Sequence, residues 1–299
     1  MSSEDSDFYG DDDVAMDLKS RVRSFDVDEW WRNQKSADTP MKVQARKQVG
    51  SASTTHLHNP FTGVEYAWQL TETVDAFLER LPPATTDATL RNQWIWVCNP
   101  YIDRKAKAEA QNQMVRGGED EMPEEEGARV LELVQAGEER LHFAGDFINM
   151  CKQSGESQAF VTRESRKAGT DAAKDILALA KNLRVTCGKW MVFCNTLEVN
   201  DVWDIIAKAT ANNELGIAAK VAPRSTTDRR AERLICIYTS DFTDVKDVKR
   251  VAERLKQLGL TRSQPLYYKP DAFTYLGIAS GNPWAIKPSI YDTRTLLGK

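Results

Sequence analysis

The chain has 299 residues, a length that suits one large domain or two small ones. Apolar residues make up 41% of it, enough for a packed core, and no apolar run is long enough to cross a membrane. The formal net charge is −4 but is unevenly spread, because residues 1–29 hold ten acids and three bases while residues 181–299 hold nineteen bases and twelve acids. An acidic tail on a basic body is typical of a protein that meets anions, although ordinary solvated surface charge gives the same pattern.

The cysteines indicate a reducing compartment. Their number is odd and their spacing matches neither a metal site nor a disulfide framework, so reduced core thiols are expected. No charged-then-apolar signal segment opens the chain, and a cytoplasmic location, or a nuclear one as well, is therefore predicted. No residue pattern indicates a metal or another cofactor. The five cysteines are Cys98, Cys151, Cys187, Cys194 and Cys236.

The first 53 residues differ in composition from the rest. They are expected to be a largely disordered acidic region, because residues 1–29 carry too few apolar side chains to fold alone. The Trp30–Trp31 pair in this region is expected to dock on the main core. Residues 54–299 are expected to form a single α+β domain with a mobile acidic insertion at 115–127.

The first half of this domain alternates apolar runs with charged stretches. It predicts a short helix at 74–81, a buried strand at 94–98, a charged helix and solvated acidic loop within 103–128, and helices at 129–151 and 171–183. Pro82 ends the first of these elements, and Asn99–Pro100 ends the strand.

The second half gives the clearest secondary-structure pattern. It predicts strands at 189–194 and 265–268, a hairpin of 216–222 with 234–239, and two amphipathic helices. The first helix is expected to be capped by Asn200, and the second is expected to begin at Thr243 or Asp244 and to end at Gly259.

The alternation of side chains along these strands predicts two different sheet faces. One face carries aliphatic residues such as Ile235 and Ile237 and is expected to lie beneath the two amphipathic helices. The other face carries Lys220 and Tyr238 from the hairpin and Lys189 from the preceding strand. Helices on one side of an antiparallel sheet and an open mixed face on the other are typical of a layered α+β fold.

The order of these sequence blocks resembles the mRNA cap-binding translation initiation factor, and more closely an uncharacterised family named for a basophilic-leukaemia-expressed protein. The blocks that resemble the cap-binding factor are QWIWVCN, GKWMVF, NDVWDIIAKA, GIAAKV, LICIYTSD and LKQLGL; those that resemble the second family are GKWM, AKV and YYKPDAFTYLGI. The resemblance implies a strongly curved antiparallel sheet with helices on its convex face and a ligand on its concave face. It also places Lys189 and Tyr238 at pocket positions, while the tryptophans that stack the methylated base have no counterpart here, Leu179 standing at one of their positions.

Lysines beside aromatic rings are the candidate ligand-binding residues. Lys189 and Lys220 suit phosphate, and Trp94, Trp96 and Tyr238 suit a stacked base. The alternatives are a lysine whose ammonium reaches water at the sheet edge and rings that only fill the concavity.

Two further basic residues are candidates at the rim. Arg224 opens a basic hairpin loop, and Lys269 follows the last strand. Each has a structural alternative, namely a solvated hairpin tip and a rigid turn.

Three functions remain open at this level. The leading hypothesis is a non-catalytic module that binds a nucleotide or an RNA end, with lysines on phosphate and aromatics on the base. The alternative is a protein–protein interaction scaffold with a vestigial pocket, linked to translation or RNA metabolism, whose partner binds the convex helices or the acidic tail. A phosphate-ester enzyme is the third, but the sequence shows no catalytic base, nucleophile or metal set for it.

Overall fold

The computed structural model describes residues 57–104, 106, 120–225, 232–261 and 264–298. The chain divides into two compact units, Met1–Thr54 and Thr55–Lys299, and only the second contains described residues. The expected acidic region with its tryptophan pair, residues 115–119 of the expected insertion, and most of the basic hairpin loop therefore lie outside the described residues.

Helices and strands alternate along the second unit. Its helices are α3 (Val74–Arg80), α4 (Val130–Gln153), α5 (Gln158–Asn182), α6 (Val199–Ala211), α7 (Val245–Gln257), α8 (Asp271–Tyr275) and α9 (Thr293–Leu297). Its strands are β1 (Ile95–Cys98), β2 (Gly188–Asn195), β3 (Ala218–Val221), β4 (Glu232–Thr239), β5 (Tyr267–Pro270) and β6 (Tyr291–Asp292).

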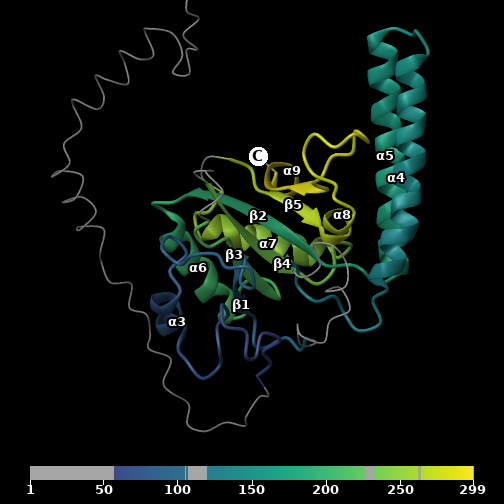
Figure 1. The fold of residues 1–299 in the computed structure, drawn as a ribbon. Coiled ribbons are helices and arrows are strands. Elements are labelled where there is room, and N and C mark those ends of the chain that lie inside the picture. Colours follow the sequence, from purple (N-terminus) through teal and green to yellow (C-terminus); the bar gives the residue numbers. More distant parts are fainter. Residues whose placement is uncertain (1–56, 105, 107–119, 226–231, 262–263, 299) are drawn as a thin grey trace, which may run out of the picture. The chain divides into compact units, whose positions relative to one another are not determined.

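The strands form one curved, open sheet in the order β1-β3-β4-β2-β5-β6 (Figure 1). All of the neighbouring strands are antiparallel, and the register sets Lys189 opposite both Tyr238 and Lys269, and Trp96 opposite Lys220. The predicted α+β class with a curved antiparallel sheet is thus confirmed.

Helices α6 and α7 cover the aliphatic face of this sheet (Figure 1). Trp190 of β2 points to this face, is fully buried, and donates its indole N–H to the carbonyl oxygen of Val248 in α7 at 3.2 Å. Ile235 and Ile237 of β4 are fully buried, and Ile237 stands opposite Trp190 in the register. The opposite face, here called the inner face, therefore carries Lys189 and Lys220 by the period of two.

Helices α4 and α5 form a long antiparallel hairpin that extends beside the sheet (Figure 1). The sequence predicted only the second half of α5, because residues 158–170 are mostly polar and bury little beyond Val161 and Gly169. The helix begins earlier because the Ser157 hydroxyl accepts the Phe160 amide and caps it. None of the described helices is both long and apolar enough to cross a membrane.

The two helix caps predicted from sequence had different outcomes. Asp244 caps α7 as expected, since its carboxylate accepts the amides of Lys246 and Asp247 at 3.1 and 3.2 Å. Asn200 does not cap α6, which already begins at Val199. Its side-chain oxygen instead accepts the amide of Ala84 at 2.9 Å and fixes the loop that follows α3, a tertiary contact that the local sequence does not encode.

Candidate anion-binding site on the inner face of the sheet

Three neighbouring strands bring the predicted ligand-binding side chains together on the inner face. Lys189 comes from β2, Lys220 from β3 and Tyr238 from β4, the strand between them. All three side chains are buried, Lys220 being only 1% exposed. The prediction of an open face beside water is therefore wrong, and the two ammonium groups need partners within the protein.

The carboxylate of Glu121 supplies that partner. One oxygen, Oε2, accepts hydrogen bonds from Lys189 Nζ and from the Tyr238 hydroxyl, each at 2.5 Å. The other oxygen, Oε1, lies 3.4 Å from Lys220 Nζ, which also donates to the carbonyl oxygen of Asp120. One carboxylate thus bridges two lysines and a tyrosine.

Glu121 belongs to residues 120–124, here called the closing segment. Glu121 and Glu124 are only 4% and 5% exposed, and Met122 between them is fully buried. The carboxylate of Glu124 accepts the backbone amides of Thr186 and Cys187 at 3.1 and 3.0 Å, where the chain enters β2. This part of the expected acidic insertion is therefore packed on the sheet and is not a solvated loop.

Asp271 adds a second carboxylate to the cluster. It is the first residue of α8, is fully buried, and accepts a hydrogen bond from Lys189 Nζ at 2.8 Å. Thr274 of the same helix accepts from the same ammonium group at 3.1 Å. Lys189 is thus held by two carboxylates and one hydroxyl.

Aromatic rings surround the ammonium group of Lys220. Its Nζ lies 4.0 Å from the ring centroid of Trp94, 5.3 Å from that of Trp96 and 5.6 Å from that of Tyr238, all within cation–π range. Trp96 and Tyr238 stack on each other with their centroids 5.9 Å apart. Trp94 is half-buried and also lines a neighbouring cavity of about 440 Å³ together with Asp120 and Phe193.

Burial and the two lysines set the protonation of these groups. Burial alone would raise the pKa of Glu121, but the charges of Lys189 and Lys220 outweigh it and lower that pKa to about 2. Burial raises the pKa of Asp271 to about 6 against the opposing charge of Lys189. Glu121 is therefore ionised at neutral pH, and its negative charge lies beside the positive charges of Lys189 and Lys220.

The two rim candidates, Lys269 and Arg224, lie in different surroundings. Lys269 is half-buried opposite Lys189 in the register, and burial together with that neighbouring charge lowers its pKa to about 8. Arg224 is half-exposed and makes a two-pronged ion pair with Asp87, at 2.7 and 3.0 Å. The prediction joined Arg224 to the pocket, whereas its guanidinium is bound to the loop that precedes β1.

The carboxylates of the site are not predicted by the local sequence. Glu121 and Glu124 stand in a run of acids, which predicts a solvated loop, and Asp271 is not among the candidate residues. Met122 and Pro123 are the only non-acidic residues between Glu119 and Gly127, and an apolar side chain inside a charged run was the available signal for a buried anchor.

The arrangement suits recognition of an anion. Two ammonium groups and the Tyr238 hydroxyl converge on one carboxylate, and the rings of Trp94 and Trp96 lie beside the Lys220 ammonium. Ammonium groups and aromatic rings together are the set of groups that binds phosphate next to a base. Among the described residues, no group of three or more His, Cys, Asp or Glu side chains is placed to hold a metal ion.

Comparisons with known proteins give a family and similarities to solved structures. A solved structure of eIF4E-3 from Ascaris suum with an m2,2,7G cap aligns with a TM-score of 0.28 and 14% identity, over 36% of this chain and 58% of that chain. The aligned part thus spans less than two thirds of that protein. Residues 18–277 match the family described as Basophilic leukemia-expressed protein Bles03. Because this match covers most of the sequence, the chain belongs to the Basophilic leukemia-expressed protein Bles03 family.

Proposed function

We propose that this protein is a non-catalytic module that binds the phosphate of a nucleotide or an RNA end on the inner face of its sheet. The observation that carries the proposal is the carboxylate of Glu121, which bridges Lys189, Lys220 and Tyr238 in a buried setting. A carboxylate in that place occupies the position that a ligand phosphate would take. The closing segment thus acts as an internal competitor for the site.

The surroundings of the cluster favour a phosphate that carries a base. Lys220 lies over the ring of Trp94, and Trp94 opens onto the cavity of about 440 Å³ that Asp120 of the closing segment also lines. A base stacked on an aromatic ring contributes about 1–3 kcal/mol. Phosphate on the lysines and a base against Trp94 would use both parts of the site at once.

A ligand can bind to the lysines only after the closing segment has moved away, and this movement costs free energy. Separating one partner from a buried ion pair costs about 3–5 kcal/mol, so the open form is a minor population of the free protein. The apparent affinity of a ligand falls in proportion to that population. Weak binding by the natural chain, and stronger binding once Glu121 is neutral, are therefore expected.

The decisive experiment compares the natural chain with Glu121→Gln. Titration calorimetry with a nucleoside triphosphate, a cap analogue and a short 5′-phosphorylated RNA should show at least about tenfold tighter binding for the variant. Glu126→Gln is the matched control, because Glu126 is exposed and lies next to the closing segment. Equal affinity for all three proteins, or no saturable binding by any of them, would refute the proposal.

A second candidate is the protein–protein interaction scaffold. The observation in its favour is that Lys189, Lys220 and Tyr238 already have partners within the chain. A groove of about 300 Å³ between α3 and α6 is lined by acids such as Asp75, Glu79 and Asp201, which suits a basic segment of a partner. A failure of Glu121→Gln to bind any phosphorylated ligand would favour this second function.

A further inference from the structure

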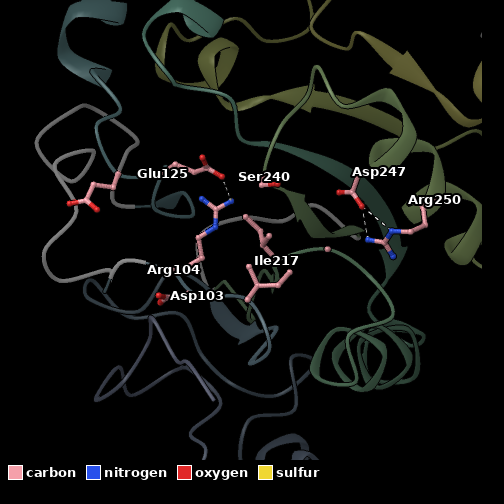
Figure 2. A pocket seen from close by; sticks show the side chains of 10 residues that line it. Asp103, Arg104, Glu125, Ile217, Ser240, Asp247 and Arg250 are labelled. Carbon is pink, nitrogen blue, oxygen red and sulfur yellow. Dashed lines mark hydrogen bonds and ion pairs between the residues drawn. The ribbon is translucent and has the colours of Figure 1, made fainter. Parts of the chain in front are cut away.

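Another cavity, of about 610 Å³, shares no lining residue with the lysine cluster. Figure 2 shows the side chains that line it. The cavity is formed where the loop after β1, the start of β3 and the end of β4 meet residues 125–126 and helix α7. Ligand pockets for small molecules commonly enclose about 300–1,000 Å³, so this cavity is large enough for one.

Arg104 is the unusual residue of this cavity. Its side chain is only 5% exposed, yet neither Nη1 nor Nη2 has a hydrogen-bond partner. The nearest carboxylate oxygen is Oε1 of Glu125 at 3.6 Å from Nη2, an ion pair beyond hydrogen-bond distance. Figure 2 shows the guanidinium turned toward Glu125. A buried guanidinium with unpaired N–H groups is costly, because its hydration is lost and not replaced.

Arg250 in the same cavity shows the ordinary arrangement. Its Nε donates to Asp247 at 2.9 Å, and its two terminal nitrogens donate to the carbonyl oxygens of Glu214 and Leu215 at 3.1 and 2.8 Å. All three side-chain nitrogens of Arg250 therefore have hydrogen-bond partners, whereas Nη1 and Nη2 of Arg104 have none. The free donors of Arg104 form a planar fork, the geometry that a carboxylate fits with both oxygens.

The remaining charges of the cavity limit what can bind there. Asp247 is neutralised by Arg250, and Asp103 is paired with His58 at 3.0 Å. Glu125 and Glu126 are both exposed and both line the cavity, and Glu125 lies beside the guanidinium. Their negative charges would repel a phosphate dianion. A ligand that satisfies Arg104 must bring a positive group for these acids.

We propose that this cavity binds a small zwitterion of the α-amino-acid type. Its carboxylate would accept two hydrogen bonds from Arg104, and its ammonium group would face Glu125 and Glu126. Such a ligand would contact the positive Arg104 and the negative Glu125 and Glu126 at the same time, which neither a simple anion nor a simple cation can do.

The test is a titration of the full chain with each common L-amino acid. Binding is measured by calorimetry and by changes in the amide chemical shifts. At least one amino acid should bind saturably, whereas acetate, methylamine and inorganic phosphate should not do so at the same concentration. Arg104→Met should weaken that binding by at least about tenfold. Arg129→Met is the matched control, since Arg129 is exposed and paired with Glu132, and it should bind as the natural chain does. Absence of binding by every amino acid, or equal binding of phosphate, would overturn the proposal.

A stability measurement separates a ligand contact from a structural role. Without ligand, Arg104→Met should leave the urea midpoint unchanged or raise it, because the substitution removes a buried guanidinium whose terminal nitrogens have no hydrogen-bond partner. A clear fall in the midpoint would mean that Arg104 supports the fold, and the proposal would fail.

Discussion

A lysine that is 4% exposed, as Lys189 is, adds to stability only through the groups that neutralise it. Its ammonium group contacts Glu121 and Asp271, and both carboxylates are buried as well. Within the lysine cluster, the proposed ligand binding and the stability of the fold therefore depend on the same residues. A change at any one of them leaves a charge without its partner.

Lys189→Met tests this dependence. The substitution keeps the length of the side chain but leaves two buried carboxylates with fewer partners, so the free energy of unfolding should fall by about 3–5 kcal/mol. Urea unfolding followed by tryptophan fluorescence measures the change. Lys181→Met, at an exposed position near the end of α5, is the control and should change stability by less than about 0.5 kcal/mol. A loss for Lys189→Met as small as that of the control would show that the cluster is not formed.

Glu124 predicts how stability depends on pH. Burial, reinforced by the charge of Asp271, raises the pKa of Glu124 from 4.5 to about 8. Between these two values the folded chain keeps a proton that the unfolded chain has lost, so stability falls as the pH rises. Asp271 has the same sign but acts below about pH 6, and Lys269, with its pKa lowered from 10.5 to about 8, acts above that value. The window from about pH 6 to about pH 8 therefore isolates Glu124.

In that window the unfolding free energy should fall on the order of 1 kcal/mol or more. Glu124→Gln should remove the dependence, because the amide does not ionise while its oxygen can still accept the amides of Thr186 and Cys187. Urea midpoints measured at several pH values give the comparison, with the exposed Glu132→Gln as control. A natural chain whose midpoint does not change across the window would contradict the assigned environment.

At the scale of elements, α6 is held to the fold by its tryptophan. Trp203 is fully buried and meets Phe77 of α3 edge-to-face, with the ring centroids 6.5 Å apart. One ring thus links α3 to α6.

Trp203→Ala should lower the free energy of unfolding by about 3–5 kcal/mol, because a large cavity replaces the ring. Chemical unfolding measures the loss. Leu197→Ala, at a position that is 90% exposed just before the same helix, is the matched control and should have little effect. If Trp203→Ala costs less than about 1 kcal/mol, the ring is not part of the core in solution.

At the scale of the whole described unit, the closing segment connects parts that are far apart in the sequence. Glu121 contacts Lys189, Lys220 and Tyr238 across three strands, and Lys189 in turn contacts Asp271 at the start of α8. The segment precedes α4, so it also links the sheet to the α4–α5 hairpin. A ligand that displaced it would therefore loosen contacts to both.

The sequence by itself determined the layered arrangement. Alternation along the strands placed Ile235 and Ile237 under the helices and Lys220 on the opposite face, because a period of two fixes the face of every residue once one is known. The bounds of helix α7 were also predicted from local sequence, because Asp244 caps its first turn and Gly259 stands just after its last turn.

Only the tertiary structure decided what covers the inner face. The charge of Glu121 predicts exposure when its neighbours in the chain are considered alone, and the lysines that compensate it are 68 and 99 residues away. Asn200 failed as a cap for the same reason, because its partner, the amide of Ala84, is 116 residues distant. A polar side chain is buried or exposed according to the charges and hydrogen-bonding groups that folding brings to it, and neither the period nor the composition of the local sequence contains those groups.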